Sequence, residues 1–524
     1  MNGEIKKFLG ELPGLAAAID APNGFARTEA RLARVAEALK GCDADDRAEC
    51  AERLRRKADD IGGAVRIYVY SFLMREIESA PDAAVLLDMA ISRDVQEAAE
   101  ILMRTGAVAF SRPSLRTPEF RAKTHRLYGH IFERLSAAVA GPAWIPPAER
   151  NNRLVVFVTQ QFLSMAHAPT RDLVYYARYF MTRLGKVPLI VNANTAEMKL
   201  SVPFYKPFIG SVNESLNAAQ TLQIDQLKIP FRQIGAQMFD FRKLSDMVHM
   251  IAGLKPAMVI GHGAGNYLAD LCGRFTDAVI HNTTDELGPF QCQASFLCRP
   301  LPEADKEMLR GLGVDPARVI QSRPAFELPN TGPALKREDF GLSDDDRAIC
   351  VVGNRLDTEI TPSYLEMLRG VLADAPKAKL LLVGSEGKLD SVAQMLKEFG
   401  DRTLQAGFQG DLLAFYNVCD AFANPPRGGG GTSAAYALSR GVPVVALPAG
   451  DVATVAGPEF VFRDEEACRA ELVRLVSDDA YLEARREAAR ARFAECEGLD
   501  GMWRAPLAAF EALTGAPLEL PQAA

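Results

Sequence analysis

A run of four glycines at positions 428–431 restricts the fold of this chain more than any other sequence feature. Thr432 and Ser433 follow it, then a helix-forming segment at 434–440 and an apolar segment at 442–447. A glycine backbone lets N–H groups approach a ligand closely, and the start of a helix favours negative charge. The two hydroxyls stand where the helix should begin, able to cap it or to bind phosphate oxygens. The segment predicts a diphosphate-binding loop, although ordinary turns and helix starts use the same residues.

Short apolar segments alternate with helical patterns on either side of this loop. Strands are expected at 348–352, 378–383, 403–408, 421–423 and 442–447, and helices at 364–372, 389–399 and 411–418. This alternation predicts a parallel sheet covered by helices, in which ligands bind at the carboxyl ends of the strands. The glycine loop follows the strand at 421–423 and so falls at that end of the sheet.

A second α/β pattern occupies residues 150–330. Strands are expected at 154–158, 187–191, 231–239, 258–260 and 278–281. The loop at 159–168 leads into a helix that begins near Pro169, since Pro in the first turn with Asp172 close behind is a good helix start.

The motifs GNRL, LLLVG, DLLAFYNVCDAFANP and GGGGTSAAYALSRGVPVV resemble the nucleotide-sugar-binding domain of GT-B glycosyltransferases. The resemblance covers about residues 347–471 and extends more weakly back to about 153. Its motif spacing is most similar to the protein O-GlcNAc transferases and the cytoplasmic bacterial N-glycosyltransferases. It implies an α/β protein with two Rossmann-like domains that face a cleft, and a helix at 502–513 that crosses back onto the first of them.

The resemblance also implies a nucleotide-diphosphate sugar as donor substrate, bound without a metal or a cofactor. Arg355 matches a basic residue after the first turn, and its guanidinium can bind phosphate oxygens through two parallel hydrogen bonds. The base would dock at the strand end near Gly407 and Phe408. Asp451 could bind the ribose or the sugar, or serve as a turn residue. The expected donor-binding residues are Arg355, Gly407, Phe408, Arg427, Gly429, Gly430, Gly431, Thr432, Ser433 and Asp451.

The chain shares the DxFxNP and GxPVV motifs with a large retaining family that carries a pair of glutamates. The corresponding positions here are near Gly429 and at Tyr436, so neither carboxylate is present. This difference favours inverting chemistry, which needs a general base to take the proton of the acceptor.

Histidine suits that role near neutral pH, and none of the six histidines lies in the nucleotide-binding domain. His167 is the candidate base, because the resemblance places a catalytic histidine in the first strand-to-helix loop; the alternative is a histidine that caps or packs against the helix. His262, in a glycine-flanked loop, is expected to contact the sugar or acceptor. His281 could line the pocket, and His249 is expected to be structural.

Composition limits the remaining classes. A formal net charge of −7 argues against a nucleic-acid binder. The sequence contains no run of 18 apolar residues, so no membrane-spanning helix is expected. Nine scattered cysteines without a C-x-x-C motif, and no signal-peptide pattern, favour reduced thiols in a cytoplasmic protein without zinc. The acidic run at 344–346 is expected to be a solvated turn and not a metal site.

Residues 1–148 read as almost entirely helical. Helices are expected at 30–39, 48–61, 64–77, 84–90, 95–108 and 120–139. This extension is either a packing or oligomerisation module, which allows a homo-oligomer, or an acceptor-recognition domain. The expected domains are therefore 1–148, 150–330, 331–500 and a crossing helix with tail at 501–524.

The resulting prediction is a metal-independent, inverting glycosyltransferase that uses a nucleotide-diphosphate sugar, with UDP favoured, and a protein or glycan acceptor. The alternatives are a retaining transferase of a glycan or lipid-linked acceptor, an epimerase or phosphorylase of the same fold, and a catalytically degenerate scaffold. The missing glutamate pair suggests the scaffold, whereas no set of carboxylates or lysines supports the epimerase or phosphorylase.

Overall fold

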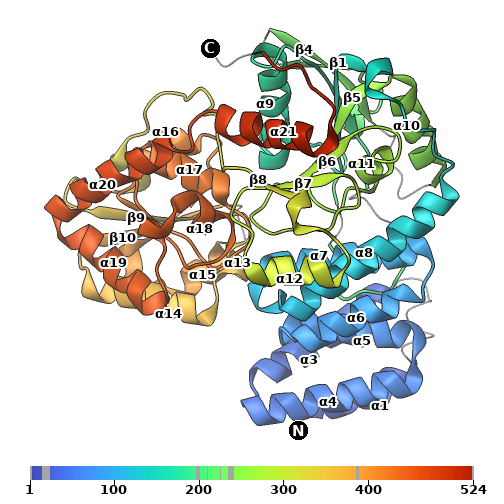
Figure 1. The fold of residues 1–524 in the computed structure, drawn as a ribbon. Helices are drawn as coiled ribbons and strands as arrows, with labels where there is room; N and C mark the ends of the chain where they lie inside the picture. The colour runs from blue at the N-terminus through green and yellow to red at the C-terminus, as the bar shows by residue number, and fades with distance from the viewer. Residues whose placement is uncertain are drawn as a thin grey trace.

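The computed structural model describes residues 3–14, 24–195, 201–208, 210–224, 226–233, 241–384 and 389–521. Two α/β lobes lie side by side, and a helical region packs against the first of them (Figure 1). The expected α/β architecture, with two Rossmann-like sheets behind an N-terminal helical region, is confirmed. No helix in the described part of the chain is long and apolar enough to span a membrane.

Each helix predicted in the N-terminal region is present. The helices are α1 (Gly3–Glu11), α3 (Gly24–Lys40), α4 (Ala44–Ile61), α5 (Gly63–Glu76), α6 (Ala80–Ile91), α7 (Val95–Ser111) and α8 (Pro118–Ala138). Gly62, at φ +72°, ends α4 and separates it from α5. Side chains at helix starts accept backbone N–H groups, as Asp94 does at α7 and Thr117 at α8. Buried Leu127 of α8 shares a continuous core with Val156 of the first lobe, so this end of the helical region is fixed to that lobe.

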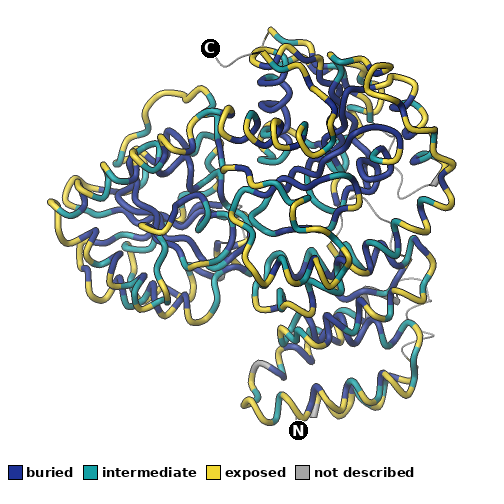
Figure 2. Tube along the Cα trace, in the orientation of Figure 1, coloured by how far each residue is buried: buried dark blue, intermediate teal, exposed yellow. Residues whose placement is uncertain are grey.

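The first lobe contains an eight-stranded sheet in the order β3-β4-β2-β1-β5-β6-β7-β8. Its strands are β1 (Asn151–Thr159), β2 (Val187–Asn192), β3 (Thr221–Ile224), β4 (Leu227–Gln233), β5 (Pro256–His262), β6 (Ala278–His281), β7 (Ala294–Leu297) and β8 (Val319–Gln321). Its helices are α9 (Ala168–Thr182), α10 (Phe241–Gly253), α11 (Tyr267–Cys272) and α12 (Glu303–Gly311). All pairs are parallel except β3 with β4, and the central strands are buried (Figure 2). The strand expected at 231–239 ends at Gln233, and 234–240 lie outside the described residues.

The second lobe contains a five-stranded parallel sheet in the order β11-β10-β9-β12-β13. Its strands are β9 (Arg347–Val352), β10 (Ala378–Val383), β11 (Thr403–Gly407), β12 (Ala421–Ala423) and β13 (Val444–Val445). Its helices are α13 (Leu356–Glu359), α14 (Pro362–Asp374), α15 (Asp390–Met395), α16 (Leu412–Tyr416), α17 (Gly431–Ser439), α18 (Gly450–Ala456), α19 (Glu465–Ser477) and α20 (Asp479–Ala494). The last strand is shorter than the expected 442–447, because only two of its residues pair with β12.

The chain crosses between the lobes twice. After α20 it returns to the first lobe as α21 (Asp500–Thr514), where Trp503 is fully buried. Its indole contacts the rings of Phe157, Phe180 and Phe296. The two crossings are hydrogen-bonded to each other: Phe326 N–H donates to the Cys496 carbonyl (2.8 Å), and Gly498 N–H donates to the Phe326 carbonyl (3.0 Å).

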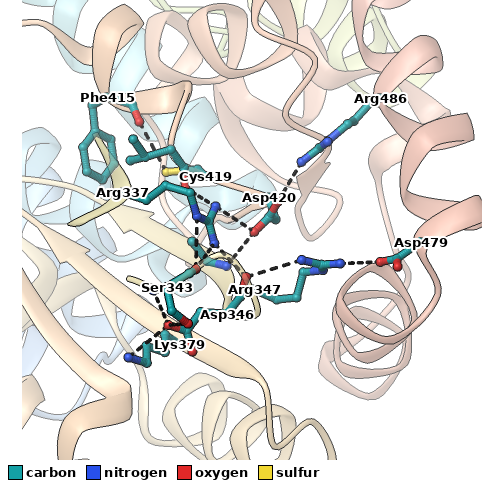
Figure 3. Close-up of polar contacts among 12 residues, drawn as sticks. Arg337, Ser343, Asp346, Arg347, Lys379, Phe415, Cys419, Asp420, Asp479 and Arg486 are labelled. Atoms are coloured by element: carbon teal, nitrogen blue, oxygen red, sulfur yellow. Dashed lines mark hydrogen bonds and ion pairs between the residues drawn. The ribbon is translucent and has the colours of Figure 1, made fainter. Parts of the chain in front are cut away.

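The acidic run at 344–346 forms an exposed turn before β9, at the amino end of the strand. Asp346 accepts the Ser343 N–H (2.6 Å) and pairs with Lys379 (3.2 Å), as Figure 3 shows. Asp420 precedes β12 at the same end and is buried. The groups that contact its carboxylate are Arg337, Arg486 and the N–H of Ala348. These carboxylates stabilise the sheet at its amino end, opposite to the glycine loop.

Candidate functional site

A cleft of about 1170 Å³ lies between the lobes. Its walls come from residues that follow the carboxyl ends of β6, β9, β10, β11 and β12, together with the start of α9. The structure brings ten of the predicted site residues to this cleft: His167, Arg355, Phe408, Arg427, Gly429, Gly430, Gly431, Thr432, Ser433 and Asp451. Gly407 and His262 are not among the cleft-lining residues.

The glycine loop leads directly into α17. Gly430, at φ +109°, occupies the N-cap position and has no side chain, so neither hydroxyl caps the helix. The Ala434 N–H donates to the Gly430 carbonyl (3.1 Å), which places Thr432 and Ser433 in the first helical turn. First-turn N–H groups have no acceptor within their own helix, so the start of α17 can bind an anion in the cleft.

One buried carboxylate holds the two candidate phosphate-binding arginines. Glu359 accepts from Arg355 Nη2 (2.9 Å) and Arg427 Nη1 (3.1 Å), while Arg427 Nε donates to Asn424 (3.0 Å). Two guanidinium groups against one carboxylate leave a net charge of about +1 here. Arg355 remains 46 % exposed in its side chain, whereas Arg427 is buried and its Nη2 has no partner among the described residues. Arg355 is therefore the more accessible of the two guanidinium groups, and Arg427 lines the cleft from a buried position.

Asp451 meets a second carboxyl group from the opposite lobe. Its Oδ1 accepts the N–H of Asp285, which follows β6 (2.8 Å). Burial, together with the charge of Asp285, raises the pKa of Asp451 well above its usual range. Burial also raises the pKa of Asp285, although Arg299 and Arg116 oppose the shift. Asp451 thus connects the two lobes beside the glycine loop.

His167 is the N-cap residue of α9 and lines the cleft. Its Nδ1 shares a hydrogen bond with the Thr170 hydroxyl (2.9 Å). With Nδ1 as donor, Nε2 is free to accept a proton. Burial, assisted by the charge of Arg171, lowers the pKa of His167, which keeps the ring neutral at pH 7 and so able to accept a proton.

The other two candidate histidines form a stacked pair at 6.1 Å between ring centroids. His262 Nε2 donates to the Pro169 carbonyl (3.0 Å), which fixes the start of α9 from behind the cleft wall. His281 lines the cleft and stacks on Trp503 at 4.9 Å. Burial lowers the pKa of His262 to about 4 and that of His281 to about 3, so both are neutral at pH 7.

The nucleotide base was predicted to dock near Gly407 and Phe408, at the carboxyl end of β11. The Gly407 carbonyl accepts the Gly384 N–H (3.0 Å), so this glycine supports the sheet edge. Phe408 is 58 % exposed and lines the cleft, which makes its ring available for stacking.

The structure adds cleft residues that the sequence analysis did not select. Glu359 stands four residues after Arg355, a helical ion-pair spacing that could have revealed it. Asp172 lines the cleft, and burial raises its pKa to about 6. Phe110 reaches the cleft from the end of α7, and no local sequence signal connects it with a loop more than 300 positions away.

Comparisons with known proteins bear on the fold and on the second lobe. Residues 348–478 match the family model described as Glycosyl transferases group 1. The structure is similar to a mutant of the O-GlcNAc transferase from Thermobaculum terrenum, with 17% identity, a TM-score of 0.53 and coverage of 99% of this chain and 100% of that one. It is also similar to a glycosyltransferase from Rickettsia africae ESF-5, with 13% identity, a TM-score of 0.52 and coverage of 70% and 100%. The comparison with curated proteins gives no significant match.

The fold is therefore GT-B, as the motif resemblance implied. The protein is a glycosyltransferase whose second lobe carries the group 1 domain.

Proposed function

We propose that the protein transfers a sugar from a nucleoside-diphosphate donor, most simply a UDP-sugar, to a protein or glycan acceptor without a metal ion. One observation carries this proposal: the glycine loop, the start of α17 and Arg355 converge on one side of a cleft. His167 lines the same cleft from the opposite lobe. The cysteines of the described residues are free thiols, which supports a cytoplasmic location.

The proposed reaction is a single displacement. His167 Nε2 takes the acceptor proton as the acceptor atom forms a bond to the anomeric carbon. The bond from that carbon to the diphosphate oxygen breaks, and the diphosphate leaves with the electron pair. Arg355 and the first-turn N–H groups of α17 offset the charge that develops on the leaving group. This mechanism inverts the anomeric configuration.

Retaining transfer is the second candidate, because members of the matched group 1 family are typically retaining. Against it, Tyr436 occupies the position of one family glutamate, and the Arg171 guanidinium lies 5.6 Å from its ring centroid. NMR of the first-formed product would decide, since an anomer opposite to that of the donor supports inversion and the same anomer supports retention.

Calorimetric titration with UDP, GDP, CDP and their sugar conjugates, with and without EDTA, tests the donor site. We expect one nucleotide family to bind equally well in EDTA. Binding abolished by EDTA would contradict the metal-free site, and no binding to any nucleotide would favour the scaffold. Product analysis separates transfer from epimerisation or phosphorolysis.

A further inference from the structure

The end of α7 forms a rigid corner that touches the glycine loop. The Arg116 guanidinium donates to the Ala109 carbonyl through Nε (2.9 Å) and to the Phe110 carbonyl through Nη2 (3.0 Å). These bonds satisfy carbonyl groups that a helix end leaves without partners. Phe110 and Arg116 therefore form one unit, called here the α7 corner, whose ring faces the cleft.

The α7 corner packs directly on the backbone of the glycine loop. A Cβ atom at Gly429 would lie 3.0 Å from Phe110 Cζ, and one at Gly428 would overlap the Arg116 guanidinium. Of the four loop glycines, only Gly430 has a positive φ. The backbone conformation therefore does not require glycine at 428 and 429, whereas the contact with the α7 corner does.

The same corner contacts both remaining walls of the cleft. The Arg355 guanidinium lies 5.3 Å from the Phe110 ring centroid, within the range of a cation–π interaction. Arg116 Nη1 pairs with Glu286 of the first lobe (3.1 Å). The helical region is thus in contact with the candidate phosphate arginine, the glycine loop and the opposite lobe at one point.

We propose that the helical region forms the third wall of the donor site, and that Phe110 is a positioning residue that sets the glycine loop and Arg355 for the donor diphosphate. This role rests on the proposed function and extends it. The alternatives given above for the helical region were a packing or oligomerisation module and an acceptor-recognition domain, and neither requires a contact with the donor loop. A shift of the α7 corner would move the loop and the arginine together.

A double-mutant cycle tests the proposal. We expect Phe110→Ala to weaken binding of the nucleoside diphosphate that wild type prefers at least tenfold, because the loop and Arg355 lose their support. Gly429→Ala should weaken it similarly, because its methyl group meets the ring. The double variant should be no weaker than Phe110→Ala alone, because removal of the ring makes room for the methyl group. Phe110→Leu should restore part of the affinity by filling the same space.

The matched control is Phe132→Ala, which removes a half-buried ring from α8 and does not line the cleft. It should lower the melting temperature and leave nucleotide affinity unchanged. Unchanged affinity in folded Phe110→Ala, or strictly additive losses in the double variant, would overturn the inference and leave the proposed function intact. Wild-type protein that binds no nucleotide would overturn the proposed function and the donor role of this wall together.

Discussion

At the scale of single residues, the hydroxyls of Thr432 and Ser433 are the first to test. Because Gly430 occupies the cap position, neither hydroxyl caps α17, and both side chains line the cleft. We expect the double change Thr432→Ala, Ser433→Ala to weaken nucleotide binding ~10- to 100-fold, since a hydrogen bond to a charged group contributes about 1.5–3 kcal/mol. Calorimetry measures the loss, and Ser439→Ala at the far end of α17 is the control. Wild-type affinity in the folded double variant would show that neither hydroxyl contacts the nucleotide.

His167 should affect turnover and not donor affinity. We expect His167→Ala to reduce kcat about 10²- to 10⁴-fold, the usual contribution of a general base, with the Kd for the nucleotide unchanged. Its lowered pKa means that the free base persists below pH 6.5. The acid limb of kcat/KM should therefore lie below that value in wild type and disappear in the variant. Normal turnover in the variant would shift the role of base to Asp172.

Buried neutral histidines should make folding sensitive to acid. The pKa of His281 is about 3 in the folded protein against 6.5 in a free histidine, so the unfolded chain binds more protons between those values. Stability should fall as the pH drops through this window, by about 1.4 kcal/mol per pH unit for one such group.

His281→Phe should reduce that slope, as measured by urea unfolding between pH 7 and pH 4. The exposed His249, whose Nδ1 contacts the Ser245 carbonyl, provides the control His249→Phe. Equal slopes for both variants would contradict the assignment. The raised pKa of Asp451 acts in the opposite direction, so only the difference between variants is informative.

The sequence allowed some of these residues to be predicted and not others. His167 immediately precedes α9, and Arg355 lies three residues after the end of β9. Both could be predicted because ligands bind where the carboxyl ends of parallel strands meet. Phe110 lies against Gly429 because the end of α7 reaches the second lobe, and no spacing within one segment records that contact. His262 was predicted to contact the sugar or acceptor, whereas it does not line the cleft and instead donates a hydrogen bond to the Pro169 carbonyl.

At the scale of elements, the turn into α18 limits the shape of the glycine loop. Gly450 has φ +77°, and a Cβ atom there would overlap the Arg427 carbonyl. We expect Gly450→Ala to destabilise the protein by about 2–4 kcal/mol, from strain at positive φ and from overpacking. Gly311→Ala, with nothing within 4 Å of the added atom, should have little effect or stabilise slightly. Similar unfolding midpoints for both variants would contradict this account.

The helices of the N-terminal region were easier to predict than the shortest strands of the first lobe. Each predicted N-terminal helix is present because apolar residues recur over many turns, whereas β3, β7 and β8 are only three or four residues long. Strands this short carry few alternations, although β6 and β12, which are equally short, were predicted. Strand β13 is two residues long because pairing with β12 ends there, a property of the neighbouring strand and not of the apolar segment.

At the scale of the whole molecule, α21 makes the first lobe depend on the end of the chain. Trp503→Ala should destabilise the protein by about 3–5 kcal/mol, because it empties a fully buried site. Hydrogen exchange should show lost protection in β5, β6 and α9, with little change in β9 and β10. Leu513→Ala, at an exposed position of the same helix, is the control. Equal loss of protection in both lobes would contradict this assignment.

The hydrogen bonds between Phe326 and the segment from Cys496 to Gly498 have a mechanical consequence. A single connecting segment between two lobes would allow them to rotate about several axes. Two segments joined by hydrogen bonds instead form a hinge that allows rotation about one axis and resists twisting about the others. We therefore expect any opening of the cleft to be mainly a rotation about one axis, which would keep the facing surfaces of the two lobes in the same alignment.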